Sequence, residues 1–320
     1  MINKYEAFNY KLKNFIHTLL LFLCMGVILS FLGFILAGVD GILWAVFLGV
    51  LILVISPNLS PSFIFSMYGG RLLSIADAPG LYQITQELAA RANLARSPAL
   101  YYLPSRLMNA FSVGTLANPA IGLSDTLLNT LNMRELIGVL AHEISHIQHN
   151  DVRLMSYADI ISRITSTLSI TGLLLIVLNL PLFFLGLVTI SWFALGVLII
   201  APDIMSFLQL SLSRMREFEA DRQAALLTGD PEGLAMALGK LEAYESSFFD
   251  ILFHRGHHSA STPSILRTHP DTDERIRRLL SLKGSPKRTL NYANDDQFAI
   301  PVHYQKSIRR PRWHLGGIWY

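Results

Sequence analysis

The sequence has little cysteine and little charge. Cys24 is the single cysteine among 320 residues and lies inside an apolar run, so an intramolecular disulfide and a cysteine-ligated metal cluster are both excluded. Charged residues make up 15% of the chain, whereas an average soluble protein has about 25%. Together with a hydrophobic content of 52% and a mean hydropathy of +0.41, this indicates that part of the chain lies in a lipid bilayer.

The chain also lacks the features of two other classes of protein. Its formal net charge is only +3, and its basic residues are spread over polar segments instead of gathering on an aromatic-rich surface. We therefore expect no nucleic-acid partner. A transporter is not favoured either, because the sequence has no internal repeat and few ionisable groups within its apolar runs.

Long apolar runs predict four membrane helices in two hairpins. Residues 15–38 and 41–55 are joined by a short link around Asp40 and form the first predicted hairpin. A signal peptide is the competing interpretation of the first run, but the second run follows at once without a small-residue cleavage site. Residues 168–212 are long enough for two more crossings, with the turn expected at Asn179-Leu180-Pro181. Asp203 near the end of this block leaves an alternative, in which its helices are buried in protein or enter the bilayer only part way.

Lysine and arginine lie on one side of both predicted hairpins. Lys4, Lys11 and Lys13 precede the first hairpin, its link contains no basic residue, and arginines such as Arg71 follow it. The second hairpin has arginines at both ends and an uncharged tip. By the positive-inside rule, the N-terminal tail and the polar domain are expected in the cytoplasm. The chain is thus expected to be a multi-pass membrane protein, of the inner or plasma membrane if it is bacterial.

A helix is predicted over residues 133–148. Asn132 followed three residues later by Glu135 is typical of a helix start. Apolar residues then recur at helical spacing and form one stripe, made of Leu136, Leu140, Ile144 and Ile147.

This predicted helix carries a zinc-binding pattern, His142-Glu143-Ile144-Ser145-His146. At about 100° per residue, His142 and His146 fall on one face, away from the apolar stripe, and Glu143 is offset from both. Two imidazoles can therefore converge on one metal, and a carboxylate lies beside them without occupying a coordination position. A catalytic zinc takes three protein ligands and keeps one position open, so a third ligand must come from elsewhere.

Candidates for the third ligand lie in two places. His149 is the nearest in sequence, but it would compete for one side of the metal. The better candidates are Glu217 and Asp221, which are one turn apart on a predicted helix that ends near Gly229. One of these carboxylates can bind zinc while the other accepts the ring N–H of a ligand histidine. Without the histidine pattern, this charged segment would be read as a solvated face next to a membrane helix.

Several ordered motifs resemble one known family. The segment 108–114, which contains Asn109-Ala110, is similar to an edge strand of that family. Residues 141–151 are similar to the helix that carries its first two ligands, and residues 216–221 are similar to its Glu-x-x-x-Asp helix. Thr268-His269-Pro270, followed by Arg275, is similar to a downstream element. On these residues the chain resembles the HtpX-type membrane zinc metallopeptidases, relatives of the CAAX prenyl endopeptidases within the gluzincin group.

The resemblance implies a role for each of these residues. It implies one zinc ion per chain held by His142, His146 and Glu217, with Glu143 as the general base. It also implies that Asp221 is the hydrogen-bond partner of a ligand histidine.

The resemblance further implies groups that contact the substrate. His269 and Arg275 would face the scissile carbonyl and stabilise the developing oxyanion. Asn109 and Ala110 would lie on an exposed strand edge, where an extended substrate binds through its main chain. Two segments depart from the family pattern: an insertion at 249–267 and a tail that starts at residue 283. The histidines of the insertion, His254, His257 and His258, either bind a second metal or, as we favour, belong to a solvated linker.

The fold class that we expect is a mainly α integral membrane protein with an α+β gluzincin-like (zincin) catalytic domain and a small sheet between residues 99 and 123. The expected segments are a cytoplasmic tail at 1–14, the first hairpin at 15–57, the first catalytic part at 58–166, the second hairpin at 167–212, the second catalytic part at 213–284 and a basic and aromatic extension at 285–320.

The expected function is zinc-dependent hydrolysis of peptide bonds in membrane or membrane-associated proteins at the cytoplasmic face, for protein quality control. Its partners are polypeptide substrates, above all misfolded or damaged membrane proteins, and the lipid bilayer. One alternative is a specific processing protease for lipidated or signal-like substrates. A second alternative is a non-catalytic scaffold or chaperone in which zinc only stabilises the fold.

Overall fold

A computed structural model describes residues 4–55, 60–189, 191–253 and 271–282 of the chain. The expected site residue His269, the histidines of the insertion and the C-terminal extension lie outside these ranges. The chain forms two compact units, one from residues 1–57 and 153–215 and the other from residues 58–152 and 216–320. Each unit combines segments that are far apart in the sequence.

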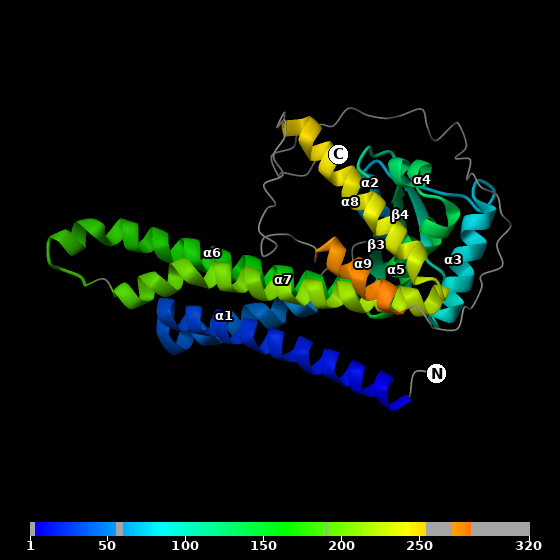
Figure 1. The fold of residues 1–320 in the computed structure, drawn as a ribbon. Coiled ribbons are helices and arrows are strands. Elements are labelled where there is room, and N and C mark those ends of the chain that lie inside the picture. The colour runs from blue at the N-terminus through cyan, green and yellow to red at the C-terminus, as the bar shows by residue number, and fades with distance from the viewer. Residues whose placement is uncertain (1–3, 56–59, 190, 254–270, 283–320) are drawn as a thin grey trace. The chain divides into compact units, whose positions relative to one another are not determined.

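The first unit begins with a helical hairpin, α1 (Lys4–Ile55). Its helical geometry is interrupted at Ala37 and at Gly38, which has φ +61°, a value that favours glycine because it has no Cβ. The chain reverses at this point, so that α1 consists of two arms (Figure 1). The arms touch through glycines, since a Cβ on Gly33 would lie 2.4 Å from the carbonyl oxygen of Gly41. The predicted turn between the first two apolar runs is thus confirmed.

Two long antiparallel helices complete this unit, α6 (Asp151–Phe184) and α7 (Trp192–Thr228) (Figure 1). The expected turn at Asn179–Pro181 is wrong, because α6 continues through Pro181 to Phe184. A proline near the end of a helix removes only one backbone hydrogen bond there, and the helix can end a turn later. Among the described residues, three helices are long and apolar enough to cross a membrane: the Asn14–Leu51 part of α1, α6 and α7.

The helices of this unit pack through buried apolar residues on their inner faces. Leu21 and Met25 of α1 form one cluster with Ala158 of α6 and Met205 of α7. Further along, Leu32 packs in a second cluster with residues of α6 and α7. Large apolar side chains such as Phe15, Leu23, Leu174 and Phe184 remain exposed on the outer faces, as expected for helices that lipid surrounds.

The second unit is an α+β domain. It contains α2 (Pro61–Met67), β1 (Arg71–Leu72), α3 (Pro79–Arg91), β2 (Ala99–Leu103), β3 (Ala110–Thr115), β4 (Asn118–Ser124), α4 (Asp125–Thr130), α5 (Met133–Gln148), the C-terminal part of α7, α8 (Pro231–Phe253) and α9 (Thr272–Ser281). Its four strands are arranged in the order β1-β2-β4-β3. The pair β2 and β4 is parallel, and β1 and β3 pair antiparallel with their neighbours. The small sheet expected between residues 99 and 123 is present.

The core of this domain lies between the sheet and α5. Residues of β2 and β4 share one buried cluster with the apolar stripe of α5; they are Leu100, Tyr102, Ile121 and Leu123 on the strands and Leu136, Leu140 and Ile144 on the helix. The predicted start of this helix is confirmed by a complete capping box, in which Asn132 and Glu135 each accept a hydrogen bond from the backbone N–H of the other, both at 2.9 Å. The core therefore holds α5 in a defined position.

Close packing of α5 on α8 leads to a stability prediction. A Cβ on Gly138 would lie 2.8 Å from the backbone nitrogen and Cα of Leu234, so Gly138→Ala must push the two helices apart. We expect it to lower the free energy of unfolding by about 1–3 kcal/mol, measured by thermal unfolding in detergent. Gly239→Ala is the control, because its Cβ would meet only Ile276 at 4.0 Å. That change should stabilise α8 by up to about 1 kcal/mol, and equal effects of the two changes would contradict the prediction.

Candidate metal centre

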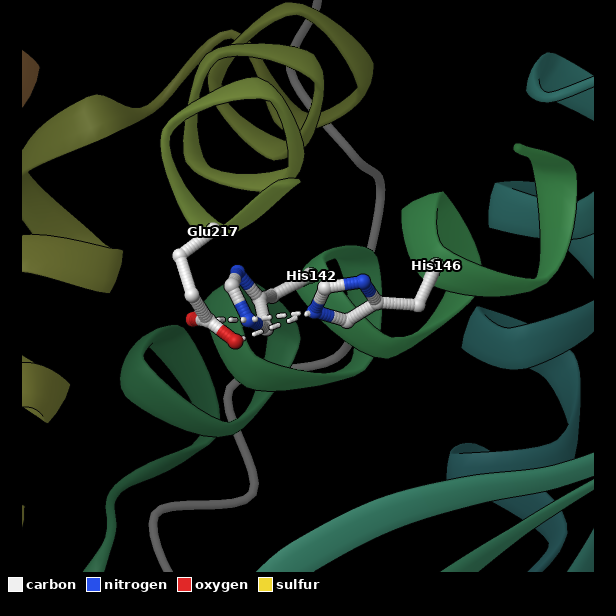
Figure 2. A group of neighbouring side chains, drawn as sticks. All are labelled: His142, His146 and Glu217. Atoms are coloured by element: carbon white, nitrogen blue, oxygen red, sulfur yellow. Dashed lines mark hydrogen bonds and ion pairs between the residues drawn. The ribbon is translucent and has the colours of Figure 1, made fainter. Parts of the chain in front are cut away.

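Three side chains from α5 and α7 converge on one point (Figure 2). His142 and His146 are one turn apart on α5, and their Nε2 atoms lie 3.1 Å from each other. Glu217 of α7 completes the group, with Oε2 3.4 Å from His142 Nε2 and Oε1 3.7 Å from His146 Nε2. All three side chains are nearly buried. Ring nitrogens and carboxylate oxygens at such distances are typical of the ligand set of a metal ion.

The spacing of these atoms fits zinc. Zinc bonds to nitrogen and oxygen are about 2.0–2.2 Å long, so tetrahedral ligand atoms lie about 3.3–3.6 Å apart. The three observed separations of 3.1, 3.4 and 3.7 Å fall around that range. The donor set of two imidazoles and one carboxylate is also one that catalytic zinc sites use. The residues that the structure brings together therefore fit a zinc ion.

Asp221 lies behind the first histidine. Its Oδ1 atom is 3.0 Å from His142 Nδ1, so a proton on that nitrogen leaves Nε2 free to act as a metal ligand. Burial disfavours a charged imidazole, but Asp221 and Glu217 outweigh burial and raise the pKa of His142 to about 10. The two carboxylates thus favour positive charge at this point of the site.

Arg275 of α9 is buried among the same carboxylates. Its Nε and Nη2 atoms each donate to Asp221 at 2.7 Å, and Nη1 lies 3.1 Å from Glu217 Oε2. Burial lowers the pKa of Arg275, but Asp221, Glu217 and Glu143 together raise it above its usual value. The neighbouring Arg277 is exposed. Of these two arginines of α9, Arg275 is thus the one buried in the site.

The remaining expected residues are placed as follows. Glu143 lies on α5 between the two histidines and is 7% exposed. His149 is not part of the cluster, because its Nδ1 atom lies 2.9 Å from the carbonyl oxygen of Ser145 at the end of the helix. Asn109 and Ala110 lie at the start of β3, whose single neighbour among the described strands is β4.

Two residues of the site were not anticipated from the sequence. Asp151 lies 2.9 Å from His146 Nδ1, and Arg216 contacts Asp151 in turn. The available signal was a carboxylate five residues after the second histidine, together with an arginine directly before Glu217. Neither indicates a contact without the folded structure, because the two residues are 65 positions apart.

Long apolar helices joined to an α+β domain, with a His-Glu-x-x-His helix facing a glutamate, define a membrane metalloprotease. Residues 76–283 match the family described as Peptidase family M48. The chain belongs to Peptidase family M48. It is accordingly a metalloprotease, a hydrolase of peptide bonds, and a membrane protein.

Curated relatives align with the chain over nearly their whole length. The chain is 31% identical over 288 residues to a "Protease HtpX homolog" of Ralstonia pickettii, with 84% of this chain and 96% of the relative covered. It is 30% identical over 290 residues to a protein of the same name from Burkholderia multivorans, with 84% and 97% covered. The resemblance to HtpX-type peptidases is thus confirmed.

The fold is shared with a solved structure. The crystal structure of S. mikatae Ste24p aligns with a TM-score of 0.50 at 22% identity, covering 84% of this chain and 67% of that protein. The expected fold class, a mainly helical membrane protein with a small sheet in its catalytic domain, agrees with this likeness.

The buried arginine leads to a second stability prediction. Arg275→Gln leaves Asp221 and Glu217 without their cation, so the metal-free protein should lose about 3–5 kcal/mol of stability. Thermal unfolding in detergent with a chelator would measure the loss. Arg277→Gln on the exposed side of the same helix is the matched control and should change stability by less than about 0.5 kcal/mol. If Arg275→Gln is as stable as the control, the carboxylates are not held by this guanidinium.

Proposed function

We propose that this metalloprotease is a zinc-dependent endopeptidase with one zinc ion per chain, held by His142, His146 and Glu217. The observation that carries the proposal is the convergence of these three ligand atoms beside Glu143. The three side chains supply two imidazoles and one carboxylate, a donor set that a single zinc ion takes in catalytic sites.

Glu143 is the general base in this proposal. Zinc held by the three ligands would supply Lewis acidity, lowering the pKa of a water molecule and polarising the scissile carbonyl. The Glu143 carboxylate accepts the proton of that water as it attacks, and then donates the proton to the leaving amine. Asp221 keeps a proton on His142 Nδ1. Its short contact with the ring nitrogen supports this role.

The substrate main chain is proposed to bind along β3. The carbonyl oxygen of Asn109 accepts a hydrogen bond from the backbone N–H of Ser124 at 3.0 Å, so Asn109 faces β4. Because hydrogen-bonded pairs alternate along an antiparallel ladder, the N–H and C=O groups of Ala110 point away from β4. An extended peptide can add to that edge through backbone hydrogen bonds, which do not read side chains. Broad sequence specificity follows from such binding.

Two further groups complete the proposal. We expect His269, which lies outside the described residues, to stabilise the oxyanion, as the family resemblance implies. For Arg275, the contacts with Asp221 and Glu217 support a positioning role more than a contact with the substrate. Since all three guanidinium nitrogens lie near these carboxylates, its main proposed task is to hold the third ligand and the partner of His142 in place.

The substrates and the side of the membrane are also proposals. Basic residues flank the apolar runs on the side of the catalytic domain, which supports a cytoplasmic site. The two arms of α1, together with α6 and α7, would make four crossings. A protease tied to the bilayer in this way meets membrane and membrane-associated proteins first. We propose that it cleaves damaged or misassembled proteins of this kind. A strand edge that binds the main chain accepts many sequences, which suits such substrates better than a single specific processing site.

Replacement of the general base tests the reaction. Full-length Glu143→Gln in detergent should bind zinc as the wild type does, yet lose about 100-fold or more of its cleavage of unfolded casein. A chelator should abolish cleavage by the wild type, and added Zn²⁺ should restore it. Glu87→Gln on the surface of α3 is the control and should remain active. Full activity of the Glu143→Gln protein would exclude this carboxylate as the base.

The strand edge can be tested with proline. Ala110→Pro removes an N–H that points away from β4, so the sheet should tolerate it, while the substrate loses one hydrogen bond. We expect kcat/KM for casein to fall about 10-fold, which corresponds to about 1.4 kcal/mol. Ala110→Ser keeps the amide and should cleave normally. If the folded proline variant cleaves as fast as the serine variant, peptides do not bind along this edge.

A further inference from the structure

His146 is held from behind by a second buried ion pair. Its Nδ1 atom lies 2.9 Å from Asp151 Oδ2, while Arg216 donates through Nε to the other oxygen, Oδ1, at 2.5 Å. The Arg216 Nη2 atom also contacts Oδ1. Asp151 is 2% exposed and Arg216 is 9% exposed. The carboxylate thus bridges a ligand histidine and a guanidinium, and water has almost no access to it.

This arrangement determines which nitrogen of His146 is available to a metal. A ring N–H that donates to a carboxylate stays on Nδ1, which leaves the lone pair of Nε2 for the metal and makes that nitrogen more basic. Nε2 is the atom that lies 3.1 Å from His142 Nε2 in the cluster. An unpaired buried carboxylate would destabilise the folded protein. Arg216 offsets this destabilisation by neutralising the charge of Asp151.

The three residues come from three consecutive helices. His146 is in the last turn of α5, Asp151 is the first residue of α6, and Arg216 lies in α7 directly before Glu217. Adjacent residues on a helix point about 100° apart. Arg216 and Glu217 can therefore contact Asp151 and the metal cluster from the same helical turn.

We propose that Asp151 and Arg216 are positioning residues for the metal ligand His146, with a role in metal binding beyond joining α6 to α7. This inference rests on the proposed zinc site. A pair that only joined two helices would explain the contact between Arg216 and Asp151, but it would not require the other carboxylate oxygen to meet the ring nitrogen of a ligand.

The experiment measures zinc affinity without relying on activity. Full-length protein carrying Glu143→Gln is purified in detergent, and its zinc dissociation constant is determined by competition with a fluorescent chelator. Asp151→Asn and Arg216→Lys are introduced into this parent. Asp151→Asn keeps the shape but removes the charge, and Arg216→Lys keeps the charge but cannot contact Oδ1 with two nitrogens. We expect zinc affinity to fall about 10–100-fold for Asp151→Asn and by a smaller factor for Arg216→Lys.

Asp230→Asn is the matched control. Arg134 on α5 donates through Nε and Nη2 to the two oxygens of Asp230 at 2.5 and 2.7 Å. This pair uses the same two donor nitrogens but does not contact a proposed ligand. Its loss should lower the unfolding temperature but leave zinc affinity within about threefold of the parent, well below the change expected for a partner of a ligand histidine.

Each outcome decides the proposal. A folded Asp151→Asn protein that binds zinc as the control does would overturn it. If Asp151→Asn does not fold, Arg216→Lys decides alone, and parental affinity in that variant would overturn the proposal. A parent that binds no zinc would overturn both this inference and the proposed function. A parent that binds zinc while the active chain cleaves nothing would contradict the proposed function alone.

Discussion

Charge compensation inside a buried site is the constraint on which the rest of this structure depends. The two histidines of α5 that we propose as ligands lie among carboxylates that are almost out of contact with water. A buried charge is tolerated only when an opposite charge neutralises it. Arg275 compensates Asp221 and contacts Glu217, and Arg216 compensates Asp151. Burial lowers the pKa of His142, but Asp221 and Glu217 outweigh burial and raise it. A divalent ion satisfies the same demand.

A single helix, α7, supplies several of the charged groups of the site. Within six residues it supplies Arg216, Glu217 and Asp221. Arg216 contacts Asp151, whereas Glu217 and Asp221 share His142 and Arg275 as partners. The rest of the domain holds α5 opposite this helix through the sheet core and the capping box. Arg278 of α9 stacks over Phe218 of α7 at 3.8 Å, which helps to keep α9 beside α7 and Arg275 within reach of its carboxylates.

The same helix connects the site to the membrane. α7 runs without a break from an apolar segment to the proposed zinc ligand, and α6 begins at the carboxylate that contacts His146. Ligands on rigid helices are oriented more precisely than ligands on loops. The proposed site is thus built in part on two helices that also supply membrane-capable segments.

Local sequence determined the elements whose signals lie within one helical turn or one apolar run. These include the capped helix with its His-Glu-x-x-His face, the turn of the first hairpin and the Glu217 and Asp221 pair. Helical periodicity and glycine geometry depend on neighbouring residues, so such elements can be predicted without the fold. Tertiary structure decided which of the many charged residues would be buried together. Asp151 and Arg216 are 65 positions apart, and Arg275 lies 54 positions after Asp221. Their charges interact strongly only when folding removes the water around them. No local sequence pattern shows which charged residues will be buried together.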